Sequence, residues 1–315
     1  MTEDPLSAVR VVVLTHGSGA PAAALADRLL ADGVDPGRII VVHNPTAPGT
    51  PAPALPHPDV EVVQTPRNLG YTGGMNLGIR RQLERDPRWV LLLTHDVRFE
   101  PGALRALVEA GERHPEYGIL GPELYDPERR TMFSYGARMS ATGGMAHVTS
   151  PPPDEQDGIV PADSIDGAVM LIRAEVLRSV GLFDEKLFIY AEESELSLRA
   201  RRAGFRVGVV RAARGEQSVG APSRPGAYGY LMTRNGLNLA RAAVGWKGVV
   251  GSLGRALIQV AVHGRRVVDP RRGDEERRAA RAAVAGVVRG AVDFFRGRWG
   301  PPPDTLSGLG DTQGT

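Results

Sequence analysis

The sequence predicts an α/β protein with a mostly parallel sheet flanked by helices and followed by a helical C-terminal appendage. Strand-like and helix-like segments alternate along the first part of the chain, which is typical of doubly wound sheets. Hydrophobic residues make up 42% and charged residues 23% of the chain, as in ordinary soluble globular proteins. The last fifth combines arginines with apolar residues at helical spacing.

Each element of this alternation has its own local signal. β-branched apolar runs predict strands, and apolar residues at a spacing of four predict helices. The second predicted helix depends on Met75, Ile79 and Leu83, which recur at that spacing. The predicted strands cover residues 11–15, 39–42, 60–63 and 89–93, and the predicted helices cover residues 22–31 and 75–83.

Polar residues follow the predicted strands at the point where each ends. In open parallel sheets, ligands bind outside the carboxyl ends of the strands, so these residues are expected to line one rim. They are Thr15, His16, His43, Asn44, Arg67, Asn68, Thr94, His95 and Asp96.

Asp96 has the clearest chemical use among these rim residues. A carboxylate there can hold a divalent cation that neutralises a diphosphate. The alternative is that Asp96 caps the loop that follows its strand. His95 is either a second ligand or an ordinary polar residue of the rim.

The segment 68–76, NLGYTGGMN, is expected to form a loop between a strand and a helix. Its glycines allow the backbone to approach a ligand and present amides to a phosphate. A tight turn without any ligand explains the glycines equally well. The segment matches neither the P-loop pattern nor the dinucleotide-binding pattern GxGxxG.

Three carboxylates, Glu192, Glu193 and Glu195, follow an aromatic stretch in a chain with few aromatics. Burial near apolar walls and other carboxylates raises the pKa of a carboxyl group, which suits a general base, and Glu193 is the candidate. The alternative is that the triplet is the acidic first turn of a helix, complementing the helix dipole. The two interpretations are compatible. The preceding aromatics are Phe183, Phe188 and Tyr190.

The C-terminal region is strongly basic. Residues 241–300 carry thirteen Lys or Arg against five Asp or Glu, whereas residues 1–240 carry 25 against 29. A basic amphipathic helix can lie on an anionic membrane surface, dock on a partner such as a second copy in a homodimer, or simply cover the catalytic domain. Nucleic-acid binding is not expected, because stacking aromatics and known binding motifs are missing from this stretch.

The absence of cysteine excludes disulfides and thiolate metal sites. The acidic start MTEDPLSAVR is unlike a secretory signal, so a cytoplasmic protein is expected, with a peripheral position at the inner face of the plasma membrane as an extension. The expected organisation is an N-terminal extension at 1–7, a catalytic domain at 8–245, a basic helical region at 246–299 and a disordered tail at 300–315.

Five motifs, in order, resemble family 2 glycosyltransferases, especially rhamnosyltransferase-like members. They are NLGYTGGMNLG at 68–78, a strand ending near Asp96, DGAVMLIR at 166–173, GLFDEKLFIYAEESELSLRARRAGF at 181–205 and RN at 234–235. The resemblance covers about residues 8–245. It implies a GT-A fold, a nucleotide-diphosphate sugar donor such as a UDP- or dTDP-sugar, and inversion at the anomeric carbon by direct displacement.

The resemblance also implies roles for individual residues. Glu193 matches the catalytic base, and Asp96 matches the aspartate that holds Mg²⁺ or Mn²⁺ against the diphosphate. The implied donor-binding residues are Thr15, His43, Asn68, Gly70, Gly74, Asn76, His95 and Asp96. The implied acceptor and sugar residues are Asp166, Gly167, Ala168, Tyr190 and Glu192.

Three positions depart from the family pattern. His43 stands where many relatives have an aspartate that faces the nucleotide base, and Thr94 stands at the first acidic position of the metal motif. A histidine often found before a serine near Ser218 is missing. Glu216 or His95 can substitute as metal ligands, or arginines can neutralise the phosphate without a metal. The candidate arginines are Arg199, Arg201 and Arg214.

Three functions remain open from the sequence. The first is an inverting glycosyltransferase that acts on a lipid-linked or polysaccharide acceptor in cell-envelope synthesis. The second is a soluble glycosyltransferase of a small-molecule acceptor. The third is a degenerate sugar-nucleotide binding protein without activity, which the departures at His43 and Thr94 favour.

Overall fold

The computed structural model describes residues 4–307 except 18–19, 48–49, 56, 151, 154, 156 and 219–222. Its contacts divide the chain into two compact units. The first, here called the sheet unit, comprises Met1–Arg138, Ala146–Asp184 and Glu192–Val219. The second, the helical unit, comprises Met139–Met145, Glu185–Ala191 and Gly220–Thr315. The predicted boundary at residue 245 separates two helices that these contacts place in the same unit.

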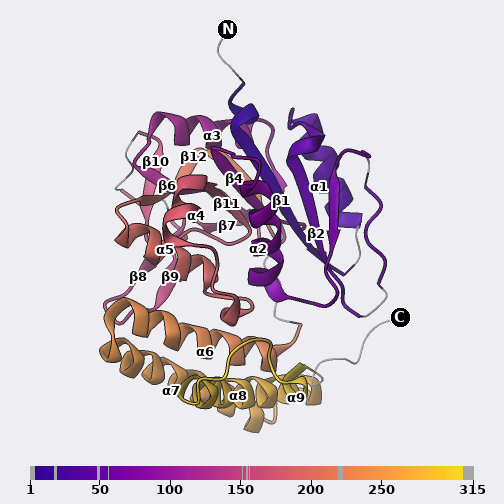
Figure 1. Cartoon of the computed structure of the whole chain (residues 1–315). Helices are drawn as coiled ribbons and strands as arrows, with labels where there is room; N and C mark the ends of the chain where they lie inside the picture. The colour runs from indigo at the N-terminus through magenta and orange to yellow at the C-terminus, as the bar shows by residue number, and fades with distance from the viewer. Residues whose placement is uncertain are drawn as a thin grey trace. The chain divides into compact units, whose positions relative to one another are not determined.

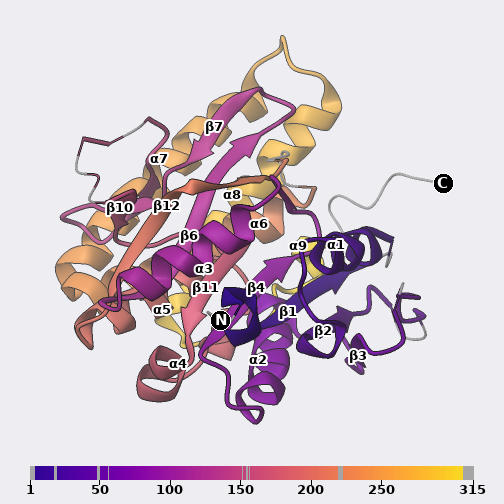
Figure 2. The same ribbon diagram turned by 90° about the horizontal axis from the view of Figure 1, so that it is seen from above.

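The sheet unit confirms the predicted α/β class. Its main strand order is β10-β12-β6-β11-β4-β1-β2-β3 (Figure 2). Strands β4, β1, β2 and β3 are parallel neighbours, and β11 runs antiparallel to both β4 and β6. Additional strands pair at one side, β5 with β12 and β7 with β6. The sheet is therefore mixed but mostly parallel.

The strands have the following bounds: β1 Val9–His16, β2 Ile39–Asn44, β3 Glu61–Gln64, β4 Trp89–Thr94, β5 Arg98–Phe99, β6 Tyr117–Asp126, β7 Thr131–Ser134, β10 Ile159–Ala162, β11 Val169–Arg173 and β12 Arg206–Glu216. A separate two-stranded sheet consists of β8 Ala137–Met139 and β9 Met145–His147. Strands β1, β2 and β4 are almost completely buried, as expected for parallel strands covered on both faces.

The helices of the sheet unit are α1 Ala20–Ala31, α2 Gly70–Leu83, α3 Ala103–Arg113, α4 Ala174–Val180 and α5 Glu192–Arg202. Short 3₁₀ turns lie at Pro5–Ala8 and Pro36–Arg38. The buried apolar residues of the strands and of α1 and α3 form one continuous core. The four strands and two helices predicted in the first hundred residues are all present, each with slightly longer bounds or a small shift.

The glycine-rich segment after β3 differs from the prediction of a loop at 68–76. Helix α2 already begins at Gly70, so only Asn68 and Leu69 precede it. A Cβ on Gly74 would lie 2.5 Å from Leu14 Cδ1, and one on Gly78 would lie 2.3 Å from Val12 Cγ1. The glycines thus allow α2 to pack tightly on β1, and this packing outweighs their low helix propensity.

Both predicted terminal segments contain ordered structure. Leu6 is buried, and the side chain of Asp4 accepts the amide of Leu6 and pairs with Arg105. The expected disordered tail at 300–315 is wrong for residues 304–307, which form α9 Asp304–Ser307. Leu306 of this turn is buried in an apolar cluster with Tyr230 and Leu231, which fixes the turn. Residues 308–315 lie outside the described part of the chain.

The helical unit contains α6 Pro225–Val244, α7 Trp246–Val268 and α8 Asp274–Phe295, which lie side by side (Figure 1). The 3₁₀ turn Glu185–Leu187 also belongs to it. Glycines bring α6 and α8 into backbone contact, since a Cβ on Gly286 would lie 2.1 Å from the carbonyl oxygen of Gly226. Within the described ranges, every helix is too short or too polar to cross a bilayer.

Candidate active site

The acidic triplet lies in the first turn of α5, and its members have different partners. Glu195 forms a salt bridge with Arg199, one turn later, at 2.7 Å. Glu192 is buried, whereas Glu193 is half-buried and accepts a hydrogen bond from Ser194 Oγ at 2.9 Å. The triplet is therefore the acidic first turn of a helix, where Glu195 pairs with Arg199, and the role of Glu193 as general base stays a prediction.

The turn before β11 lies against Glu193. Asp166 Oδ1 accepts the backbone amide of Ala168 at 2.9 Å, and the carbonyl oxygen of Ala168 accepts the amide of Thr94 at 3.0 Å. A Cβ on Gly167 would lie 3.6 Å from Glu193 Cβ. The predicted residues 166–168, Glu192 and Glu193 are thus brought together by β11, β4 and α5.

Tyr71 of α2 completes this group, and the sequence analysis did not single it out. Its hydroxyl donates a hydrogen bond to the carbonyl oxygen of Gly167 at 2.6 Å. Its ring packs edge-on against Phe183, with 5.5 Å between ring centroids. The sequence signal that could have identified Tyr71 is an aromatic residue inside a glycine-rich stretch, in a chain with few aromatics.

The environment of Glu193, Asp166 and Tyr71 favours the protonated forms of their side chains. Burial, with a smaller contribution from Asp166, raises the pKa of Glu193 from 4.5 to about 7. Burial also raises the pKa of Asp166, and the nearby charge of Asp96 acts in the same direction. Burial, together with the charges of Glu192 and Glu193, raises the pKa of Tyr71 well above its ordinary value, so its hydroxyl stays protonated.

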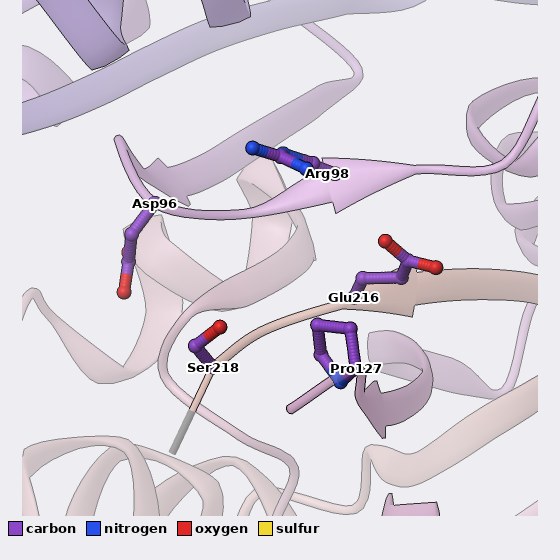
Figure 3. Close-up of a pocket in the computed structure, with 5 residues that line it drawn as sticks. All are labelled: Asp96, Arg98, Pro127, Glu216 and Ser218. Atoms are coloured by element: carbon purple, nitrogen blue, oxygen red, sulfur yellow. The ribbon is translucent and has the colours of Figure 1, made fainter. Parts of the chain in front are cut away.

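A small open pocket of about 100 Å³ lies beside Asp96. Figure 3 shows Asp96 and Arg98 on one segment and Glu216 and Ser218 on the neighbouring segment that includes β12. Gln217 Nε2 donates to Asp96 Oδ2 at 3.4 Å. The pocket therefore joins two carboxylates, one guanidinium and one hydroxyl at the end of β12.

The oxygen donors of this pocket are of the type that binds Mg²⁺ or Mn²⁺. No cluster of three or more His, Asp or Glu side chains suited to a metal occurs in the described part of the chain. Asp96 and Glu216 nevertheless line the same pocket, and Mg²⁺ is usually held by one or two carboxylates together with substrate phosphates and water. The residues present fit a cation that arrives with a diphosphate.

The three arginines suggested as phosphate partners have other partners in the structure. Arg199 pairs with Glu195, Arg201 pairs with Asp163 at 2.6 Å, and Arg214 lies 3.5 Å from Glu100. Each positive charge is thus already balanced by a carboxylate. Arg98, which the sequence analysis did not name, is instead the arginine that lines the Asp96 pocket.

The predicted base-recognition residues lie beneath the rim. Thr15 and His43 are neighbours in the β1–β2 register, and both are fully buried. His43 Nε2 donates to the carbonyl oxygen of Gly17 at 3.2 Å. Nδ1 and Thr15 Oγ1 have no hydrogen-bond partner among the described residues. Their contact with a nucleotide stays a prediction.

Asn44 organises the entry to α2, although the sequence analysis gave it no role of its own. Its amide group donates to the carbonyl oxygen of Gly70 at 2.7 Å, and its Oδ1 accepts from Thr65 Oγ1 at 3.0 Å. Asn68 Oδ1 accepts the amide of Gly70 at 2.8 Å. The side chains of Asn44 and Asn68 therefore hold the turn between β3 and α2.

The other predicted donor residues of α2 are packed rather than exposed. Gly74 faces Leu14 and Asn44. Asn76 is buried and exchanges two hydrogen bonds with the backbone of Phe183, at 2.9 and 3.0 Å. Asn76 thus fixes the segment that leads toward the acidic triplet, and a direct contact with the donor stays a prediction. His95, by contrast, is half-buried next to Asp96.

Tyr190 belongs to the helical unit, where its ring packs edge-on against Tyr228 at 5.2 Å. Its backbone has a positive φ of 73°, which is strained for a residue other than glycine. The side-chain amide of Asn235 donates to the carbonyl oxygens of Tyr190 and Ile189, at 2.8 and 2.9 Å. The RN motif therefore holds the loop before α5, and the predicted acceptor role of Tyr190 stays a prediction.

The fold is similar to solved glycosyltransferase structures. The structure of GalNAc-T7 with UDP, GalNAc and Mn²⁺ has a TM-score of 0.52 at 14% identity, covering 68% of this chain and 43% of that one. A mannosyltransferase from Pyrobaculum calidifontis in complex with GDP-Man and Mn²⁺ has a TM-score of 0.50 at 13% identity, covering 91% of this chain and 86% of that one. These similarities confirm the GT-A fold.

Curated relatives are similar in sequence over part of their length. The N-acetylglucosaminyl-diphospho-decaprenol L-rhamnosyltransferase of Mycobacterium tuberculosis is 30% identical over 54% of this chain and 62% of its own length. A low-salt glycan biosynthesis hexosyltransferase of Haloferax volcanii is 28% identical over 48% of this chain and 50% of its own. The chain thus spans between half and two thirds of the length of these relatives.

The family comparison extends over most of the sheet unit and into α6. Residues 11–238 match the family described as glycosyltransferase like family 2. This range includes all the residues of the candidate site from Tyr71 to Ser218. The match covers more than half of the sequence, and the chain therefore belongs to the family 2 glycosyltransferases.

Proposed function

We propose that this protein transfers a sugar from a nucleotide-diphosphate donor to an acceptor hydroxyl, with Glu193 as the general base. The observation that carries this proposal is the position of Glu193, half-buried beside Asp166 and Gly167 with a pKa raised to about 7. A carboxylate with such a pKa is a much better proton acceptor near neutral pH than an ordinary glutamate.

The proposed reaction is a single displacement at the anomeric carbon. Glu193 accepts the proton of the acceptor hydroxyl as its oxygen forms a bond to the anomeric carbon. The bond from that carbon to the diphosphate oxygen breaks at the same time, and the diphosphate leaves with the electron pair. Because the two oxygens are on opposite sides of the carbon, the configuration inverts.

The pocket beside Asp96 is the proposed diphosphate end of the donor site. Arg98 can offset negative charge on the phosphates, and Asp96 and Glu216 would hold Mg²⁺ or Mn²⁺ there. When bound, such a cation supplies charge neutralisation to the leaving diphosphate. The pocket is too small for a whole nucleotide sugar, so the sugar and base are expected to extend from it.

The proposed acceptor is a lipid-linked or polymeric glycan of the cell envelope. The name of the mycobacterial relative includes a diphospho-decaprenol acceptor, and that of the haloarchaeal relative refers to glycan biosynthesis. At 30% identity or less, these names support a class of acceptor and do not identify one particular acceptor molecule. Transfer to a soluble small molecule in the absence of lipid would contradict this part of the proposal.

The test is a panel of UDP-, dTDP- and GDP-sugars, each with Mn²⁺, Mg²⁺ or EDTA. Thermal stabilisation reports donor binding, and release of nucleotide reports turnover. The expected result is stabilisation by one nucleotide class, with slow hydrolysis that Glu193→Gln abolishes. The matched control is Glu175→Gln, an exposed glutamate in the first turn of α4.

The outcomes separate an enzyme from a degenerate binding protein. Donor binding without turnover in the wild type, both alone and with lipid-linked acceptors, would favour a non-catalytic binder. If no donor of the panel binds, the proposal is contradicted. If the donor stabilises the protein equally in EDTA and in Mn²⁺, the metal is not part of the donor site. Arg98 would then be the cation that faces the diphosphate.

A further inference from the structure

Helix α7 carries a large apolar surface that the rest of the described chain leaves uncovered. Trp246, Val250, Leu257 and Ile258 expose 58, 69, 70 and 63% of their surfaces. Apolar side chains of this size are normally buried when they recur along a helix. Val262 of α7 and Phe295 of α8 are also exposed. A continuous patch of this kind indicates an interaction surface.

These side chains share one half of the helix. At 100° per residue, Trp246, Val250 and Leu257 fall within about 40° of one another, and Ile258 and Val262 extend the surface to about 160°. The buried residues Val249 and Ser252 lie on the opposite half. The exposed face is therefore a defined side of α7 rather than a set of scattered residues.

The charges of α7 are all positive. The helix contains Lys247, Arg255, Arg265 and Arg266 and no aspartate or glutamate. Lys247 and Arg265 fall on the same half as the apolar residues, and Arg266 lies at its edge. Long basic side chains can keep their charges at a polar surface while neighbouring apolar groups enter a nonpolar layer.

An aromatic pair stands at the start of this face. The rings of Trp246 and Phe295 stack with 6.4 Å between their centroids, and Arg241 lies over the Trp246 ring at 4.9 Å. Both rings remain more than half exposed. Tryptophan bordered by arginine and lysine is the composition expected at the boundary between lipid headgroups and acyl chains.

From these observations we infer that the exposed face of α7 docks on an anionic lipid bilayer, lying in the headgroup region without crossing it. Anionic headgroups complement Lys247, Arg265 and Arg266, and the apolar residues enter the acyl boundary. A second copy of the chain is a poorer occupant, because a symmetric contact would bring the same cations together. This inference is independent of the proposed transferase activity.

The experiment is sedimentation of the full chain with vesicles of phosphatidylcholine alone or mixed equally with phosphatidylglycerol. The wild type is expected to bind the mixed vesicles, with weaker binding at high salt. The double variant Leu257→Ser/Ile258→Ser is expected to lower the partition constant at least about tenfold. Its matched control is Val62→Ser, which alters an exposed apolar residue of β3.

The charges are tested separately. Arg265→Gln/Arg266→Gln is expected to weaken binding to the mixed vesicles about tenfold. Arg113→Gln/Arg130→Gln removes the same charge from exposed positions of the sheet unit and is expected to leave binding unchanged. Trp246 fluorescence should shift to shorter wavelength on binding, and Trp246→Phe should lose most of that shift, since Trp89 is fully buried and Trp299 packs against Phe294.

Three results would overturn the inference. They are equal binding to both vesicle types, no binding to either, and unchanged binding of both Leu257→Ser/Ile258→Ser and Arg265→Gln/Arg266→Gln. A dimer that forms without vesicles and is lost in Leu257→Ser/Ile258→Ser would instead assign the face to a second copy. Because the assay contains no donor or acceptor, Glu193→Gln should bind vesicles like the wild type, whatever its activity.

Discussion

Glu193 and Glu195 show how neighbouring residues of one type acquire different chemistry. Glu195 forms a salt bridge with Arg199 at 2.7 Å. Among the described residues, Ser194 Oγ is the one side-chain group that hydrogen-bonds to Glu193, and the neighbouring carboxyl group of Asp166 also has a raised pKa. Burial therefore dominates at Glu193 and raises its pKa to about 7.

This pKa predicts an acidic limb in the pH dependence of turnover. Glu193 must be deprotonated to accept a proton, so kcat/KM should rise tenfold per pH unit below about 7 and level off above it. Initial rates between pH 5 and pH 9 measure this directly. An activity that is flat down to pH 5 would show that the titrating base is another group.

Tyr71 is expected to act as a positioning residue for the turn at Gly167. Removing its hydroxyl in Tyr71→Phe leaves a carbonyl oxygen without its 2.6 Å partner, at a cost of about 1–3 kcal/mol. Denaturant unfolding measures this loss. Tyr228→Phe, at a more exposed tyrosine, is the control and should change stability by less than about 0.5 kcal/mol. Equal losses in the two variants would contradict the role.

Among the elements, the strands were the easiest to predict from the sequence. Strands β1, β2 and β4 are runs of branched apolar residues, and their own composition determines burial on both faces. The polar strand ends also indicated where a site would lie. These signals are local, so they can be recognised without knowing which residues each strand packs against.

The sequence predicted a loop where α2 begins, because the need for its glycines depends on residues that are distant in sequence. The close approach of Gly74 to Leu14 and of Gly78 to Val12 depends on packing across the sheet. The burial of Thr15 and His43 and the partners of Arg199 are equally non-local. The resemblance to a family proposed Glu193 and Asp96 as site residues, which stays a prediction, whereas Tyr71 and Arg98 became candidates only from their neighbours in the structure.

Helices α6 and α8 depend on the same kind of close approach. In Gly286→Ala, the new Cβ would meet the carbonyl oxygen of Gly226 at 2.1 Å, and backbone cannot move aside as a flexible side chain does. We expect a loss of stability of about 1–3 kcal/mol or more, measured by denaturant unfolding.

Gly254→Ala in α7 is the matched control, since nothing lies within 4 Å of its Cβ position. It should be neutral or stabilise the protein by up to about 1 kcal/mol, because alanine is the better helix former. A similar effect of the two substitutions would show that α6 and α8 are not packed through their glycines.

At the scale of the whole molecule, the chain separates two kinds of surface. The sheet unit carries the group formed by Tyr71, Gly167 and Glu193 and the pocket beside Asp96. The helical unit carries the basic and apolar face of α7. The proposed transfer to a lipid-linked acceptor requires both chemistry and access to a bilayer, and the two proposed surfaces would supply them.

The most direct test of the central claim compares sugar-transfer rates of the wild type, Glu193→Gln and Glu175→Gln, with donor affinity measured on the same samples. The account predicts that Glu193→Gln keeps its donor affinity and loses at least about 100-fold in rate, because only the proton acceptor is removed. Glu175→Gln should match the wild type. A Glu193→Gln protein that binds donor and still turns over at the wild-type rate would contradict the assignment of Glu193 as the base.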